Sequence, residues 1–144
     1  MREIKFRGMG LNNGEWVYGV GVTKYLFSIE TYGEGRAWIF VSPHGNKSDV
    51  NGGWIEVYPE TVGEYIGRLD KNDKEIYEGD IIEVSMSCDG GTLPHIGKIV
   101  YDSTFGSFGT ENEAGITLLH NHCLHTAKVI GNIHENPELL GGVK

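Results

Sequence analysis

The chain has 144 residues, of which 39% are hydrophobic and 22% charged, a composition typical of a folded domain. Its 20 Asp and Glu residues outnumber its 12 Lys and Arg residues and give a net charge of −8. Nucleic acids and anionic membranes attract Lys and Arg, so this balance disfavours both as partners. No apolar run reaches the roughly 18 residues of a membrane span. The first ten residues, MREIKFRGMG, lack the apolar core of a signal peptide. We therefore expect a cytoplasmic protein.

Short strands separated by turns are predicted along the first half of the chain. The 22 glycines follow no collagen-like period, and they favour turns and strands over long helices. Alternating apolar and polar residues predict a strand over 3–8. The aromatic, β-branched segment 15–29 predicts one bent strand or a hairpin, with Gly19 and Gly21 at the bend. Further strands are predicted over 36–41, 53–58 and 61–69.

The second half predicts a series of short strands and one helix. The polar run 70–74 lies between two apolar segments and predicts a hairpin turn, and Gly79-Asp80 predicts a second turn. In the tail, Asn136 is suited to cap a helix and Pro137 to occupy its first position. Strands are predicted over 81–84, 96–102, 104–110, 115–119 and 127–133.

Three stretches of the sequence resemble a known family: MREIKFRG at the start, VGEYIGRLDKNDKEIYEGDIIEV in the middle and KVIGNIHENPEL near the end. Their residues and order are similar to those of the YopX family, small proteins carried by bacteriophages and prophages of Gram-positive bacteria. The resemblance implies a mostly β protein that forms homo-oligomers and has no established activity. The resemblance implies no catalytic or binding residues for this chain. The hairpin of the family often reads Asn-Gly where this chain has Asn72-Asp73.

The predicted fold is all-β with a short C-terminal helix. We expect an N-terminal β subdomain over residues 1–64, packed on a C-terminal subdomain over residues 65–144. The second subdomain contains five short strands with one long first loop, which is the plan of an SH3-like small barrel. Alternation in DIIEV and GKIVY, with the strand AKVIGNI, predicts its core residues: Ile82, Val84, Ile99 and Val129.

The densest acidic cluster lies around the first turn of this second subdomain and comprises Asp70, Asp73, Glu75, Glu78 and Asp80. It superficially resembles a calcium loop. That reading fails because Glu75 replaces the required glycine and Ile81 stands where a bidentate Glu belongs. A turn between strands usually leaves carboxylates in water, so we expect a solvated turn without catalytic acids.

The stretch LLHNHCLHT, Leu118 to Thr126, contains the candidate metal ligands His120, His122, Cys123 and His125. On a strand, His120 and His122 would share one face and could supply two ligands to zinc. A third ligand would have to come from His44, His95, Cys88 or a carboxylate. Convincing zinc motifs bring two spaced pairs of ligands, whereas this chain has one cluster. We interpret the stretch as a histidine-rich connection and expect no metal and no other cofactor.

These observations favour a phage or prophage accessory protein that binds proteins and is not an enzyme. We expect it to self-associate and to bind an unidentified host or phage protein. Two alternatives stay open: a metal-dependent hydrolase built on residues 120–125, and an acidic inhibitor that mimics nucleic acid and blocks a host protein. Aromatic residues crowd the first half and serve either sheet packing or a subunit interface. They are Trp16, Tyr18, Tyr25, Trp38, Trp54, Tyr58 and Tyr65.

Metal analysis tests the hydrolase alternative. A cluster without a guaranteed third ligand should bind zinc weakly and lose it on dialysis, because tight binding needs a complete set of deprotonated donors. His122→Ala should then leave the melting temperature nearly unchanged. Elemental analysis of protein purified without a histidine tag checks this. One zinc per chain that survives dialysis, with a melting temperature that drops sharply on chelation, would favour the hydrolase.

Overall fold

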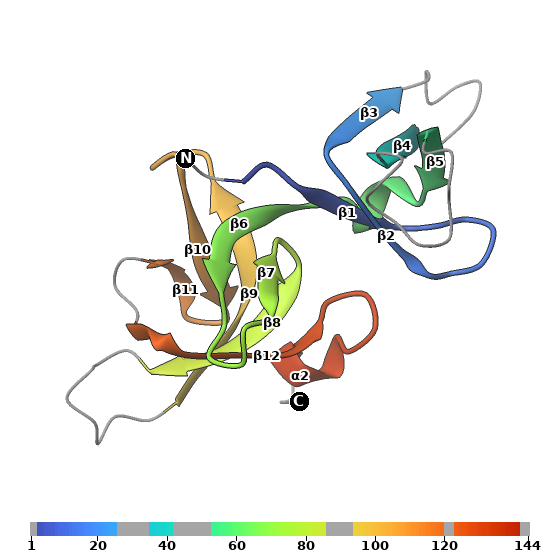
Figure 1. Ribbon diagram of the computed structural model, residues 1–144. Coiled ribbons are helices and arrows are strands. Elements are labelled where there is room, and N and C mark those ends of the chain that lie inside the picture. The colour runs from blue at the N-terminus through green and yellow to red at the C-terminus, as the bar shows by residue number, and fades with distance from the viewer. Residues whose placement is uncertain (1–2, 26–34, 42–52, 86–93, 120–122, 142–144) are drawn as a thin grey trace. The chain divides into compact units, whose positions relative to one another are not determined.

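The computed structural model describes residues 3–25, 35–41, 53–85, 94–119 and 123–141 (Figure 1). Antiparallel strands dominate these residues, which confirms the all-β prediction. The chain divides into two compact units, Met1–Tyr65 and Ile66–Lys144. Strand β6, Gly63–Leu69, crosses the boundary between them. Its first residues pair with β1 in the first unit, and its later residues neighbour β7 in the second.

Two sets of antiparallel strands organise the first unit. Strand β1, Phe6–Met9, pairs with β2, Trp16–Gly19, and with the start of β6. A separate sheet contains β3, Gly21–Tyr25, then β4, Arg36–Val41, and β5, Gly53–Val57, in the order β3-β4-β5. A short 3-10 helix, η1, occupies Pro59–Thr61.

The segment 15–29, as far as the structure describes it, is a bent strand and not a hairpin. Strand β2 pairs with β1, whereas β3 pairs with β4, so the chain changes sheets at Val20. The Val20 N–H donates to the Phe40 carbonyl oxygen over 3.0 Å. A side chain on Gly19 would overlap that same carbonyl, so the crossing requires glycine.

The core of the first unit is built by one face of the β3-β4-β5 sheet together with β2. Along β4, Ala37, Ile39 and Val41 are buried, while the alternate residues point to the other face. The buried cluster comprises Val17, Ala37, Ile39, Val41 and Val57, with Phe6, Val22, Ile55 and Val62 partly buried against it.

A five-stranded antiparallel sheet organises the second unit, in the order β11-β10-β9-β8-β12. Its strands are β8 Asp80–Ser85, β9 Pro94–Asp102, β10 Ser107–Asn112, β11 Gly115–Leu118 and β12 Cys123–Asn132. Along the chain, strand β7, Glu75–Tyr77, comes before these strands, and helix α2, Glu138–Gly141, comes after them. Strand β10 begins three residues later than predicted, because residues 103–106 turn and Gly106 adopts φ +61°. Asn136, predicted to cap α2, directs its Oδ1 to the Asn132 N–H at 3.3 Å.

The predicted core of the second unit is confirmed. Ile82, Val84, Ile99 and Val129 all belong to one buried cluster. The cluster also contains Ile66, Ile76, Phe108, Leu124 and Ala127.

The turn between β6 and β7 is held by a buried carboxylate. Asp70 is only 5% exposed. Its Oδ1 accepts hydrogen bonds from the N–H groups of Asn72 and Lys74 at 2.8 and 2.9 Å. Its Oδ2 accepts from the Val129 N–H of β12 at 2.9 Å. Beside it, the Lys71 N–H donates to the Ala127 carbonyl over 2.8 Å. The turn therefore covers the edge of β12 that does not pair with β8.

The prediction of a solvated acidic turn is wrong for Asp70 and Asp80. Asp80 is 1% exposed, and its Oδ2 accepts from the Tyr77 N–H at 2.8 Å. Burial alone would raise the pKa of Asp70, but its hydrogen bonds to Val129, Lys74 and Asn72 outweigh burial and hold the pKa below its usual value. Asp73 is exposed and adopts φ +64°, the left-handed conformation that glycine takes more easily.

Replacing Ile82 by Asp should unfold the second unit. Ile82 is completely buried in the core, and a carboxylate there would lack a charged partner. We expect a loss of more than about 3 kcal/mol, at the high end of single substitutions. The control Phe105→Asp introduces the same charge at a side chain that is 69% exposed. Circular dichroism melts check this, and a wild-type melt for Ile82→Asp would remove the core assignment.

Replacing Asp70 by Asn should destabilise the protein in a pH-dependent way. The amide offers one acceptor oxygen where the carboxylate offers two, so a buried N–H loses its partner at a cost of about 1–3 kcal/mol at pH 7. Because folding lowers the pKa of Asp70, its stabilisation is present above the unfolded pKa of about 3.9 and fades as the pH falls through the lower folded value.

Urea titrations of wild type and variant from pH 7 to pH 2.5 measure this difference. The gap in free energy of unfolding should be full at pH 7 and should narrow below about pH 4. Asp73→Asn is the matched control, because the exposed Asp73 lies in the same turn and Asn tolerates positive φ. A gap that stays constant with pH would exclude this role for the Asp70 carboxylate.

Candidate functional site

The outward face of the β3-β4-β5 sheet carries an unusual concentration of large side chains. The pairing register aligns Thr23 with Trp38, and Trp38 with Glu56. One pair further along, Phe40 lies opposite Trp54. These residues alternate with the buried ones, so they share the face opposite the core. We call this set the aromatic face: Thr23, Arg36, Trp38, Phe40, Trp54 and Glu56.

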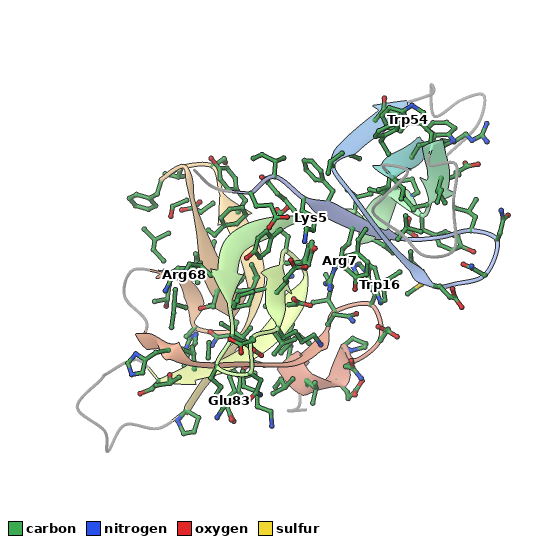
Figure 2. The ribbon with its side chains drawn as sticks, in the orientation of Figure 1. Lys5, Arg7, Trp16, Trp54, Arg68 and Glu83 are labelled. Carbon is green, nitrogen blue, oxygen red and sulfur yellow. The ribbon has the colours of Figure 1, made fainter. Side chains whose placement is uncertain are left out.

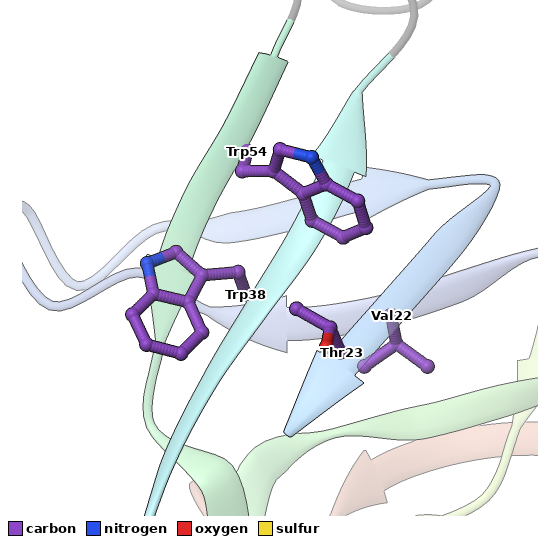
Figure 3. Close-up of a pocket in the computed structure, with 4 residues that line it drawn as sticks. All are labelled: Val22, Thr23, Trp38 and Trp54. Atoms are coloured by element: carbon purple, nitrogen blue, oxygen red, sulfur yellow. The ribbon is translucent and has the colours of Figure 1, made fainter. Parts of the chain in front are cut away.

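A pocket of about 550 Å³ lies on the aromatic face (Figure 3). Its described lining residues are Val22, Thr23, Trp38 and Trp54. The Trp54 ring packs against Phe40 with centroids 5.2 Å apart and planes tilted by 56°. It extends over β4 to within 4.0 Å of the position that a Cβ on Gly21 would occupy. Trp54 nevertheless remains 54% exposed. The volume lies within the range of about 300–1,000 Å³ that is usual for ligand pockets.

An ion pair borders the aromatic face. Arg36 Nε and Nη2 donate to the two carboxylate oxygens of Glu56 at 2.7 and 2.8 Å. The Arg36 guanidinium also lies 4.9 Å from the centre of the Trp38 ring. The hydrogen bond raises the pKa of Arg36 and lowers that of Glu56. Both groups therefore stay ionised at neutral pH, and their charges cancel.

Other cations of the first unit also lie over aromatic rings, away from the aromatic face. Arg7 is 4% exposed and lies 4.4 Å from the centre of the Trp16 ring, as Figure 2 shows. Lys5 lies 5.7 Å from the ring centre of Tyr65. A hollow beside Trp16 has a volume of only about 150 Å³. These contacts stabilise the unit, and the hollow beside Trp16 is smaller than the pocket on the aromatic face.

The predicted metal ligands fall mostly outside the described residues. This holds for His120 and His122, and the side chain of Cys123 is not described although its backbone begins β12. His125 is exposed on β12. Within the described ranges, no three His, Cys, Asp or Glu side chains gather as a metal site would require. His44 and Cys88, considered as third ligands, also lie outside these ranges. Metal binding by the cluster stays a prediction.

A histidine and a hydroxyl do meet in the second unit, but they form a structural contact. His95 Nε2 lies 2.9 Å from Thr110 Oγ1. Burial lowers the pKa of His95, which favours neutral imidazole. Thr110 is completely buried and cannot reach a substrate as a nucleophile. The pair joins neighbouring strands β9 and β10.

The aromatic residues of the first half divide between packing and exposure. Tyr65 is buried, Trp16 and Trp38 are half-buried, and Tyr18, Trp54 and Tyr58 are exposed. The Tyr25 side chain is not among those described. Phe40 and the Arg36–Glu56 pair were missed as site residues. The alternation in RAWIFV carries the signal, because it separates Arg36, Trp38 and Phe40 from the apolar residues of the opposite face.

Comparison with known protein families identifies one family for this chain. The family model described as YopX protein matches residues 5–141. The crystal structure of protein EF1440 from Enterococcus faecalis is similar, with a TM-score of 0.51 and 24% sequence identity over 97% of this chain and 99% of that one. At that identity the likeness concerns the fold. No curated protein sequence matches significantly. In the described part of the chain, no helix has the length and apolarity to cross a bilayer. The match over nearly the whole sequence shows that this chain belongs to the YopX family.

Proposed function

We propose that this protein works by binding other proteins and is not an enzyme. The observation that carries this proposal is the aromatic face, where a pocket beside the 54% exposed Trp54 adjoins a neutralised ion pair. Tryptophan and arginine are enriched among the residues that dominate binding energy at protein interfaces. A recess lined by exposed indole is also a normal place for a partner to dock.

The chemistry of the reactive side chains supports a binding role. Asp70 and Asp80 are buried and accept hydrogen bonds from backbone N–H groups, which is a structural use of a carboxylate. Thr110 is buried beside His95. None of these three residues presents a reactive oxygen to solvent, whereas catalysis needs a group within reach of a substrate.

We further propose that the second unit is an SH3-like small barrel and that copies of the chain self-associate, as phage or prophage accessory proteins in the host cytoplasm. The five-stranded antiparallel order and the shared core support the barrel. Strand β11 lies at an edge of its sheet and pairs with β10 alone among the described strands. Its Ile116 is 47% exposed. The unpaired backbone groups of an edge strand can pair with a strand of another chain.

A tagged pull-down from phage-infected host cells tests the proposal. We expect a partner to be retained by wild type and lost with Trp54→Ala, because truncating a central interface tryptophan commonly costs 2 kcal/mol or more, roughly a thirtyfold loss in affinity. Phe105→Ala is the matched control, since Phe105 is 69% exposed but lies in the second unit. It should retain the partner.

The same cells carry a second, differently tagged copy of the chain. Its capture by the first copy tests self-association. A partner that is retained equally by Trp54→Ala would exclude the aromatic face as the docking surface. The non-enzymatic proposal would be contradicted if the protein converted a substrate and this activity disappeared when one buried carboxylate or hydroxyl side chain was replaced.

A further inference from the structure

The connection between β1 and β2 carries an exposed asparagine that is followed by a glycine. Asn13 Oδ1 accepts a hydrogen bond from the Glu15 N–H over 3.0 Å, so the side chain folds over the intervening Gly14 amide in an Asx turn. Gly14 adopts φ +68°, and a Cβ there would meet no atom beyond its chain neighbours within 4 Å. The amide carbon of Asn13 therefore lies on the side of the Gly14 nitrogen, in open surroundings.

This arrangement suits an attack by the main chain on the asparagine side chain. The Gly14 nitrogen gives its proton to hydroxide and forms a bond to the Asn13 Cγ, and the side-chain nitrogen takes up a proton and leaves as ammonia. The product is a five-membered succinimide ring. Water then opens the ring at either carbonyl and leaves aspartate or isoaspartate, so the whole sequence consumes one water and releases one ammonia. Because both reacting groups belong to neighbouring residues, neither has to be brought from solution.

Hydrogen bonds around the Asn13 amide favour the same step. Negative charge develops on Oδ1 as the new bond forms, and the Glu15 N–H already points at that oxygen. The leaving nitrogen, Nδ2, lies 3.4 Å from Glu15 Oε2, which is long for a hydrogen bond. The developing charge is therefore stabilised, while the departure of ammonia breaks only a weak contact.

One contact opposes the reaction. The Gly14 N–H donates to the Gly10 carbonyl over 3.0 Å, and this bond must open before the nitrogen can attack. A typical intramolecular hydrogen bond contributes about 0.5–1.5 kcal/mol, which corresponds to a slowing of up to about tenfold. The turn therefore retards the attack and does not prevent it.

Two other asparagines form the same kind of turn but are followed by larger residues. Asn112 and Asn132 each accept from the backbone N–H two residues further on, over 2.9 Å. The next residues are Glu113 and Ile133, whose side chains crowd the nitrogen that would attack, whereas glycine has no Cβ. The leaving nitrogen of Asn112 is also held by a 2.9 Å hydrogen bond to the Ile96 carbonyl. Both asparagines are therefore internal controls for the glycine requirement.

We propose that Asn13 is a deamidation site, at which the folded protein converts without an enzyme to aspartate and isoaspartate forms. Either product places a carboxylate beside Glu15, where the amide had donated a hydrogen bond. Isoaspartate also lengthens the main chain by one methylene inside the turn that the Gly14 N–H closes onto Gly10. The hollow beside Trp16, which Asn13 and Glu15 line, gains negative charge. The change is covalent and accumulates with the age of the protein.

Peptide mapping of the full-length protein tests the inference. Folded protein is incubated in mildly alkaline buffer, digested with pepsin in acid to suppress further deamidation, and analysed by mass spectrometry. The peptide that contains Asn13 should gain the mass difference between NH2 and OH. Its rate should lie within about tenfold of that of a synthetic peptide spanning residues 8–19. Peptides containing Asn112 and Asn132 should stay unchanged. The second Asn-Gly pair of the sequence, residues 51–52, lies outside the described ranges and is read in a separate peptide.

Two variants assign the reacting groups. Asn13→Ser should abolish the mass gain, which distinguishes Asn13 from its neighbour Asn12. Gly14→Ala should slow the conversion at least about tenfold, equivalent to a barrier raised by about 1.4 kcal/mol, because a Cβ crowds the closing ring. Circular dichroism melts establish that both variants are folded, and the same Gly14→Ala change in the synthetic peptide gives the comparison if the protein variant is not.

Three results would overturn the inference. A mass gain that persists in Asn13→Ser would place the reaction at Asn12. Conversion of Asn13 that is unaffected by Gly14→Ala would exclude attack by the Gly14 nitrogen as the step that sets the rate. Conversion in the folded protein that is more than about tenfold slower than in the synthetic peptide would show that the hydrogen bond to Gly10 blocks the site.

Discussion

The attachment of the β6–β7 turn to β12 in the second unit depends on the carboxylate of Asp70. Asp70 closes its own turn by accepting from Asn72 and Lys74, and it joins that turn to β12 by accepting from Val129. The neighbouring bond from Lys71 to Ala127 completes the covering of the β12 edge. A buried carboxylate is costly unless its lone pairs are satisfied, and here three backbone N–H groups satisfy them. The same bonds that stabilise the charge also fix which strand the hairpin lies against.

The two faces of strand β4 have different roles in the first unit. Ala37, Ile39 and Val41 of β4 hold the core, while Arg36, Trp38 and Phe40 build the aromatic face. Because side chains alternate along a strand, a substitution on one face can leave the other nearly intact. This separation allows Trp54 and Trp38 to be changed as tests of binding without direct loss of core packing. One face of the small sheet can therefore hold the core while the other carries the proposed binding surface.

Local patterns predicted most of the strands and the core residues Ile82, Val84, Ile99 and Val129, because alternation is a property of a few consecutive residues. The sequence of segment 15–29 was compatible with either a bent strand or a hairpin. The bend at Val20 arises because β1 pairs with the first half of the segment and β4 with the second half, which local patterns do not reveal. The burial of Asp70 was missed because its partner Val129 lies 59 residues away. The aromatic face also required the register between β4 and β5, which aligns Phe40 with Trp54. The histidine cluster lies largely outside the described residues, so its role rests on sequence alone.

Strand β6 has a consequence for synthesis on the ribosome. Its first residues, Gly63 and Glu64, complete the pairing with β1, so the unit that ends at Tyr65 needs no later part of the chain to close its strand pairs. The remainder of β6 leads into a turn whose last hydrogen-bond donor, Val129, is translated 59 residues later. Domains generally fold as units, with the N-terminal one first. We therefore expect the two halves of a single strand to acquire their structure at different times, the first before β12 has been synthesised and the second only after Val129 has been added to the chain.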